Sequence, residues 1–186
     1  MTKTVKFLWN TVMNVILAAI VALAILLVGV RLVGIRPLVV LSGSMEPTYH
    51  VGSMIYVKSV DPESIEVGDP ITFLINEDLV MATHRVIEID AENQYFYTQG
   101  DANDAPDGAP VHFKNLVGKP IFTIPKLGYI SDWVTNPPGL YIAGTGMVMF
   151  LILLFVPDIL AKADEADRKA EEKKRKAAEE KEKIDA

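Results

Sequence analysis

Two long stretches without a charged side chain limit most strongly how this chain can fold. The first covers residues 7–30 and the second covers residues 133–157, and both are rich in aliphatic side chains. A helix of about 20 apolar residues crosses the hydrocarbon core of a bilayer. We therefore expect transmembrane helices over residues 7–30 and 137–157. The remaining segments are then residues 1–6, 31–136 and 158–186.

Each stretch also has an alternative interpretation. The first could be a cleavable signal peptide, but such a peptide has a shorter apolar region followed by a small-residue cleavage site. Here the bulky sequence Arg-Leu-Val-Gly-Ile-Arg-Pro follows at residues 31–37, so we expect an uncleaved anchor. The second could be a buried helix of a soluble domain, because its densest part, residues 140–156, is short for a span. The charged segment behind it favours a membrane helix.

That charged segment, residues 161–186, consists almost only of Ala, Lys, Glu, Asp and Arg. Opposite charges stand four residues apart at Glu171–Arg175, Glu172–Lys176 and Glu179–Lys183, a spacing that supports a helix. The segment has no apolar stripe with which to pack into a core. We expect a solvated helical tail, and a partner-binding or ribosome-facing role stays open.

The distribution of basic residues predicts the orientation in the membrane. Nine of the 18 Lys and Arg residues lie in the tail, and two precede the first apolar stretch. Basic residues close to membrane helices favour the cytoplasmic side. We therefore expect a multi-pass protein of the cell membrane, with both termini cytoplasmic and residues 31–136 outside the cytoplasm.

The middle segment has the pattern of β structure. Short runs of β-branched or aromatic residues alternate with polar ones and are separated by Gly, Pro, Asn and Asp. These runs cover residues 38–41, 53–57, 70–75, 82–89 and 94–98. The sequence therefore predicts a mainly β protein, with a small antiparallel β domain between the two membrane helices.

Composition excludes several kinds of chemistry. The chain has no cysteine, so a disulfide, a thiolate metal site and a cysteine nucleophile are impossible. Three histidines without cysteine disfavour a structural zinc site. A formal charge of −6 disfavours nucleic acid as a partner. We expect neither a cofactor nor a metal.

The segment Ser-Gly-Ser-Met-Glu-Pro-Thr at residues 42–48 is a candidate nucleophile loop. A serine beside glycine can present its hydroxyl to a substrate carbonyl, and small neighbours leave backbone N–H groups free to stabilise an oxyanion. Taken alone, the segment is more typical of a plain turn. Serine also needs a base that accepts its proton.

The three histidines differ as candidate bases. His50 and His112 lie in predicted turns and suit surface or packing roles. His84 lies in the middle of a predicted strand, where it could be a core residue or a base. Its strand has no cleanly apolar face, because Ala82 and Glu88 share the face of His84. We therefore expect this strand to line a groove or an edge.

A loop at residues 98–108 carries three aspartates within seven residues. Loops dense in Asp and Asn bind calcium, but the spacing here does not follow the EF-hand pattern. A plain turn and a calcium site both remain alternatives to an active-site carboxylate.

Together these segments resemble signal peptidase I, specifically the ER-type Ser-His branch of family S26, which also occurs in archaea and some Gram-positive bacteria. Four ordered motifs carry the resemblance. They are Ser-Gly-Ser-Met-Glu-Pro-Thr at 42–48, Val-Gly-Asp-Pro-Ile-Thr-Phe at 67–73, Thr-His-Arg-Val at 83–86 and Gln-Gly-Asp-Ala-Asn-Asp-Ala-Pro-Asp at 99–107. The resemblance extends from the first span to about Trp133 and implies a signal peptidase/LexA-like β fold.

The motifs depart from the family pattern in places. Pro70 stands where a β-branched or aliphatic residue is commoner, and Ala102 and Asp104 loosen the usual Gly-Asp-Asn-Asn pattern. The third motif holds His84 where the bacterial branch carries lysine. A Ser–Lys peptidase of related fold is disfavoured for that reason, since Lys58 has no motif around it.

The resemblance implies a role for each matching residue. Ser44 matches the acyl-forming nucleophile and His84 the general base. Asp107 matches the triad aspartate, whereas Asp101 matches a second aspartate that supports the site through hydrogen bonds. The Ser42 hydroxyl and the Ser44 backbone N–H match the oxyanion hole. Arg85, next to the histidine, matches a structural residue.

The resemblance also implies the substrates and partners. They are the signal peptides of secreted preproteins, the lipid bilayer and the secretion machinery. The cut follows an extended segment with small residues, which we expect strands near residues 53–57 and 81–86 to bind. Residues 121–130 are either a surface resting on lipid or a packed final strand pair. A catalytically inactive membrane assembly or scaffold protein that keeps the fold is the alternative function.

Overall fold

The structure is a computed structural model that describes the backbone of residues 3–75 and 80–184. The side chains that it describes are those of residues 4–75 and 80–174. The chain divides into two units. One combines Met1–Ile20 with Leu140–Ala186, and the other is Val21–Gly139.

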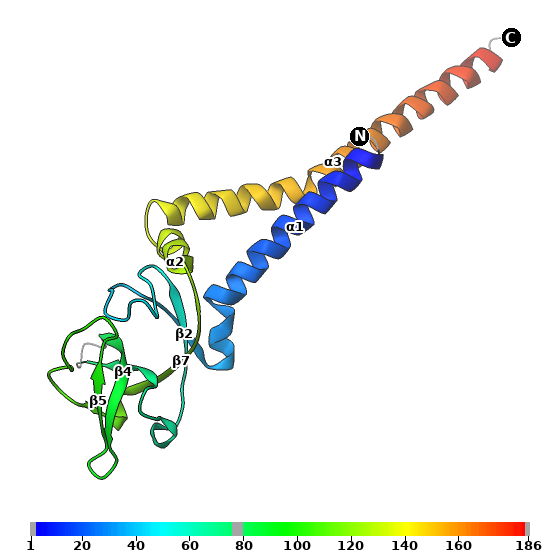
Figure 1. The fold of residues 1–186 in the computed structure, drawn as a ribbon. Helices are drawn as coiled ribbons and strands as arrows, with labels where there is room; N and C mark the ends of the chain where they lie inside the picture. Colours follow the sequence, from blue (N-terminus) through cyan, green and yellow to red (C-terminus); the bar gives the residue numbers. More distant parts are fainter. Residues whose placement is uncertain (1–2, 76–79, 185–186) are drawn as a thin grey trace. The chain divides into compact units, whose positions relative to one another are not determined.

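The first unit is helical. It contains most of α1 (Lys3–Leu27) and of α3 (Gly139–Ile184), drawn in blue and in yellow to red in Figure 1. The stretches Thr4–Leu27 and Gly139–Lys174 are each long and apolar enough to cross a membrane. An ion pair of 2.9 Å joins Lys6 Nζ to Asp158 Oδ1, and Met13 of α1 is buried.

The charged tail continues α3 without a break. Lys169 Nζ lies 2.6 Å from Glu165 Oε1, one turn earlier, which is the kind of contact expected of a solvated helix. The three pairs predicted from the sequence each include a side chain beyond residue 174. Those side chains lie outside the described residues.

The second unit contains a seven-stranded antiparallel sheet, which confirms the predicted mainly β domain. The strand order is β1-β2-β7-β3-β4-β5-β6. The strands are β1 (Ile35–Val39), β2 (Met54–Lys58), β3 (Pro70–Leu74), β4 (Met81–Asp90), β5 (Tyr95–Gln99), β6 (Val111–His112) and β7 (Leu116–Ile124). The central position of β7, beside β2 in Figure 1, was not anticipated from the sequence.

Short helical elements connect and extend the sheet. The 3₁₀ turns are η1 (Gly29–Val33), η2 (Pro62–Ser64) and η3 (Phe113–Asn115), and α2 covers Leu127–Thr135. The segment 121–130 therefore does not form a strand pair of its own, and its contact with lipid stays a prediction. Its first part completes β7, and its second part begins α2, with Leu127 buried and Tyr129 and Ile130 exposed.

Strand β2 lies at the junction of two clusters of the core. Ile55 and Val57 point into a cluster with Met45 and Tyr49, which belong to the predicted nucleophile loop. Met54 and Tyr56 point the opposite way, toward Leu127 and the last turns of α1. The side chains alternate because successive residues of a strand face opposite sides. The loop that carries Ser44 is thus fixed to the sheet by buried apolar contacts.

Candidate active site

Ser44 lies in the loop between β1 and β2. The loop is closed at its base, where Gly52 N donates to Val40 O over 2.9 Å. Met45 and Tyr49 anchor it, being 2% and 9% exposed, and Tyr49 N donates to Met45 O. Ser44 itself is half-buried, and its Oγ is 3.4 Å from Ser42 Oγ. A short loop with two buried anchors therefore holds the hydroxyl in place.

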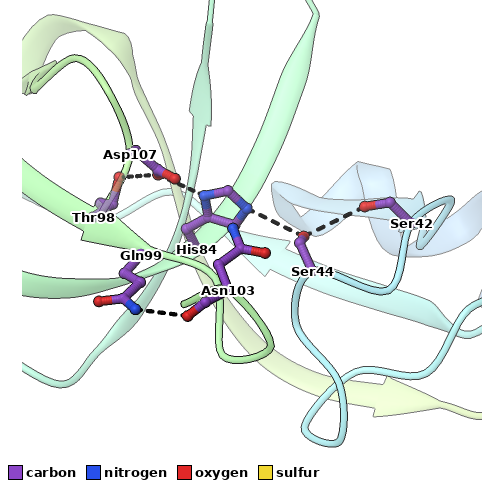
Figure 2. Close-up of polar contacts among 7 residues, drawn as sticks. All are labelled: Ser42, Ser44, His84, Thr98, Gln99, Asn103 and Asp107. Carbon is purple, nitrogen blue, oxygen red and sulfur yellow. Dashed lines mark hydrogen bonds and ion pairs between the residues drawn. The ribbon is translucent and has the colours of Figure 1, made fainter. Parts of the chain in front are cut away.

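The structure brings Ser44, His84 and Asp107 together, and the dashed lines in Figure 2 run from Asp107 through the His84 ring to Ser44. His84 Nε2 is 3.1 Å from Ser44 Oγ, and His84 Nδ1 is 2.6 Å from Asp107 Oδ2. The carboxylate only accepts, so Nδ1 donates to it and Nε2 is left to accept the serine proton. This is the arrangement of nucleophile, base and orienting acid that activates a serine.

Thr98 supports the aspartate end of this line. Its Oγ1 donates to Asp107 Oδ2 over 2.7 Å, and Asp107 N donates to Thr98 O over 2.8 Å. Thr98 is 1% exposed, so its hydroxyl is shielded from solvent. This residue was not predicted from the sequence. The signal was the alternation of β5, which places Thr98 on the same buried face as Phe96.

Asp101 lies at the other end of the same loop and has different partners. Arg85 donates to both of its oxygens, from Nε to Oδ1 over 2.8 Å and from Nη2 to Oδ2 over 2.7 Å. Thr48 Oγ1 also donates to Oδ2, and Arg85 Nη1 donates to Gly68 O. The hydrogen bonds from Arg85 hold the pKa of Asp101 below its usual value, against the effect of partial burial. This cluster ties all four sequence motifs together.

The second motif forms the turn that leads into β3. Asp69 accepts a hydrogen bond from Lys119 Nζ of β7 and another from Glu66 N over 3.1 Å. Its carbonyl accepts from Val86 N, and Gly68 N donates back to Val86 O. The turn is thereby attached to β4 two residues beyond His84, so it sets the position of the histidine strand.

The aspartate loop also contacts the serine loop through the backbone. Ala102 N donates to Ser44 O over 2.9 Å. A Cβ atom at Gly100 would lie 2.6 Å from Ser44 O and 2.7 Å from Asn103 Nδ2, so only glycine fits at this position. The absence of a side chain at Gly100 lets the two loops meet, and Asn103 then lies beside Ser44 and His84 at the cavity.

The other two histidines lie in the predicted surface and packing environments. His50 is exposed and contacts Glu46, and His112 Nδ1 accepts a hydrogen bond from Lys114 N at the start of η3. Asp104, the middle aspartate of the loop, is exposed. Among the described residues, no group of three acidic, histidine or cysteine side chains is arranged to hold a metal ion.

A cavity of about 550 Å³ borders Ser44 and His84. Its walls come mainly from β1 and the residues that follow it, Leu38 to Leu41, and from Met81–His84 at the start of β4. The segment 81–86 therefore lines the cavity largely as predicted. The segment 53–57 contributes only Ile55, because β1 lies between it and the opening.

Three known proteins have sequences similar to that of this chain. Signal peptidase I W of Bacillus subtilis is 36% identical over 121 residues, 60% of this chain and 63% of that protein. The signal peptidase complex catalytic subunit SEC11 of Zygosaccharomyces rouxii is 30% identical, over 53% of this chain and 65% of its own length. The human subunit SEC11C is 27% identical, over 54% and 57%.

The chain aligns with less than two thirds of the length of each of these relatives. A family model described as signal peptidase, peptidase S26, matches residues 12–106, just over half of the chain. The matched segment contains Ser44 and His84 and ends next to Asp107. This chain is therefore a member of the signal peptidase family, peptidase S26.

Proposed function

We propose that this chain is a membrane-bound serine endopeptidase that removes N-terminal signal peptides from secreted preproteins. The observation that carries the proposal is the line of hydrogen bonds from Ser44 through His84 to Asp107. The names of the relatives support the substrate class, since they are signal peptidases or the catalytic subunits of signal peptidase complexes.

In the first half of the reaction, Ser44 Oγ attacks the carbonyl carbon of the scissile bond while its proton passes to His84 Nε2. Asp107 stabilises the imidazolium that results, because its carboxylate accepts the Nδ1 hydrogen bond. The Ser44 backbone N–H and the Ser42 hydroxyl are the proposed donors to the oxyanion. His84 then gives its proton to the leaving amine, and the acyl-enzyme remains on Ser44.

In the second half, a water molecule replaces the amine. His84 Nε2 accepts a proton from the water as its oxygen attacks the acyl carbon. The tetrahedral intermediate collapses by breaking the bond between the acyl carbon and Ser44 Oγ. The Ser44 oxygen then takes the proton back from His84. The cut signal peptide departs with a new carboxyl terminus, and the free enzyme is restored. Asp101 has no part in these transfers and acts by positioning Arg85 and the loop.

Two open strand edges suit an extended peptide. β1 is an edge strand of the sheet. β5 pairs with β4 only from Arg85 to Asp90, so in the described part of the chain Met81–His84 has a strand on one side only. Both edges border the cavity beside Ser44. An extended substrate can add to such edges through backbone hydrogen bonds.

The membrane arrangement is part of the proposal. We infer that α1 and the apolar part of α3 cross the cell membrane, that both termini are cytoplasmic and that residues 31–136 lie outside the cytoplasm. The Lys6–Asp158 ion pair supports this, because it joins the start of α1 to the point where α3 becomes charged. Preproteins would reach the site from the secretion machinery, after their signal peptides have entered the membrane.

Cleavage of a labelled preprotein by the full chain in detergent tests the function. The account predicts that Ser44→Ala and His84→Ala each lower kcat by about 10⁴-fold or more. His112→Ala is the matched control, since this histidine lies outside the site, and it should retain activity. Undiminished cleavage by either site variant contradicts the mechanism. A wild-type chain that folds but does not cleave favours the scaffold alternative.

A further inference from the structure

A second cavity, of about 590 Å³, adjoins the first within the β unit. Leu38 of β1 and Met81 of β4 line both cavities. The two spaces therefore lie on either side of the same pair of residues. A peptide that lies beside Ser44 and continues along β1 passes from one cavity into the other.

The second cavity is basic. Arg31 and Arg36 both line it, and none of its lining residues is acidic. In the described side chains, neither guanidinium takes part in a hydrogen bond or an ion pair. Each guanidinium carries five N–H donors and no acceptor. Two such groups facing one cavity in a chain of net charge −6 indicate a ligand that is anionic or rich in acceptors.

The cavity also lies where the chain leaves its first apolar helix. Arg31 belongs to η1, four residues after the end of α1 at Leu27, and Gly34 in the left-handed conformation ends this turn. Leu32 and Val33, beside Arg31, are 91% and 72% exposed. Such exposure is expected of side chains that contact lipid. The two arginines are therefore placed at the membrane end of the substrate path.

We propose that this cavity binds the C-terminal end of the substrate's apolar helix, with Arg31 and Arg36 donating hydrogen bonds to its free carbonyls. The proposal rests on the proposed function. The last four carbonyls of a helix have no partner within it and carry a partial negative charge, which cations stabilise. Arginine supplies several donors at once and so suits a ring of carbonyls better than a single acceptor.

The path from Arg36 to Ser44 limits the register of this contact. Arg36 precedes Ser44 by eight residues, but β1 ends at Val39 and the chain then bends toward Ser44, so the path is shorter than eight extended residues of about 3.3 Å each. A peptide running alongside β1 with its cut at Ser44 would place residues about five to eight positions before the cut beside Arg36. An anionic lipid headgroup would satisfy the same arginines, but it would not account for the continuity with the catalytic cavity through Leu38 and Met81.

The test uses three matched preproteins that differ only at the seventh residue before the cut, which is Glu, Gln or Lys. The wild-type full chain in phosphatidylcholine-containing micelles should give kcat/KM in the order Glu, Gln, Lys, with a total spread of about tenfold. Arg31→Gln and Arg36→Gln should each reduce the spread to about threefold, and Arg36→Glu should bring Lys ahead of Glu. Lys114→Gln removes one exposed charge elsewhere and should keep the wild-type order.

A second readout separates a binding defect from a folding defect. A small fluorophosphonate that reacts with the nucleophile does not reach the second cavity, so its rate with Arg31→Gln and Arg36→Gln should equal that of the wild type. If those rates fall as well, circular dichroism and the Arg36→Lys variant, which keeps the charge, show whether the fold is lost. Restoration of the wild-type substrate order by Arg36→Lys supports the proposal.

The possible failures are distinguishable. A wild-type chain that cleaves none of the three preproteins contradicts the proposed function itself. If cleavage depends on Ser44 but all arginine variants keep the wild-type order of the three substrates, the second cavity is not a substrate site and the proposal is overturned. The arginine variants could instead lose the same fraction of kcat/KM on all three substrates, by an amount that grows with added phosphatidylglycerol. That result would assign the arginines to a lipid headgroup and would also overturn the second cavity as a substrate site.

Discussion

The two ends of the loop at residues 100–108 carry the same side chain in two different settings. At one end, Asp101 accepts hydrogen bonds from Arg85 and Thr48. At the other end, Asp107 accepts from His84 and Thr98. One carboxylate faces a permanent cation, whereas the other faces a ring that can gain and lose a proton. The partner therefore decides whether an aspartate holds the site together or takes part in proton transfer.

The difference also concerns which parts of the chain each aspartate connects. The Asp101 cluster joins the serine loop, the turn at Gly68, β4 and the aspartate loop. Among the described residues, the hydrogen bonds of the Asp107 carboxylate reach only Thr98 of β5 and the His84 ring. Loss of Asp101 should thus loosen the scaffold, and loss of Asp107 should leave the scaffold intact with an inactive histidine.

The largest expected effect is that of Asp107→Asn on catalysis. An amide can donate to His84 Nδ1 and so hold the proton on Nε2, where it can no longer accept from Ser44. We expect kcat on a preprotein to fall by about 10³–10⁴-fold, with little change in thermal stability. A loss of less than about tenfold would remove Asp107 from the proposed triad.

Asp101→Asn should mainly affect stability. It removes the charge that pairs with the half-buried Arg85, and we expect the free energy of unfolding to fall by about 2 kcal/mol. The expected loss in kcat is at most about 100-fold, because the line from Ser44 to Asp107 remains. Thermal unfolding in detergent, followed by circular dichroism, measures the first quantity and preprotein cleavage the second. A catalytic loss as large as that of Asp107→Asn, in a stable variant, would contradict the distinction.

Thr98→Val should have a smaller effect on the catalytic end. Valine keeps the shape but leaves Asp107 Oδ2 with one donor fewer, and we expect kcat/KM to fall by about fivefold to tenfold. Thr123→Val, which removes a hydrogen bond to Met54 O in the sheet, is the matched control. Equal activity of Thr98→Val and the wild type would show that the Thr98 hydroxyl is not needed to position Asp107.

The smallest effect is the dependence of stability on pH through Asp101. Because its pKa is lowered in the folded chain, Asp101 binds its proton more readily in the unfolded chain. Its contribution is therefore fully present above the unfolded pKa of about 4 and is lost as the pH falls through the lower folded value. The difference in unfolding temperature between the wild type and Asp101→Asn should be smaller at pH 3 than at pH 6. A constant gap would contradict a charge-based role.

The sequence predicted the mainly β domain and the site segments because these depend on local patterns. Alternation marked β4 and β5, and Gly beside Ser marked the nucleophile loop. The central strand β7 was missed because its place between β2 and β3 depends on long-range pairing. Thr98 was missed for a similar reason, since its role depends on where the loop returns to meet β5. The different roles of Asp101 and Asp107 were predicted from the resemblance to a known family and not from their spacing.

The rate at which a small fluorophosphonate modifies Ser44 tests the central claim most directly, because it does not depend on how a preprotein binds. Mass spectrometry of the full chain would locate the adduct and follow its formation. The account predicts an adduct on Ser44, formed about 100-fold or more slowly in Asp107→Asn but less than about tenfold more slowly in Asp101→Asn. An adduct on another residue, or equal rates in the two aspartate variants, would contradict it.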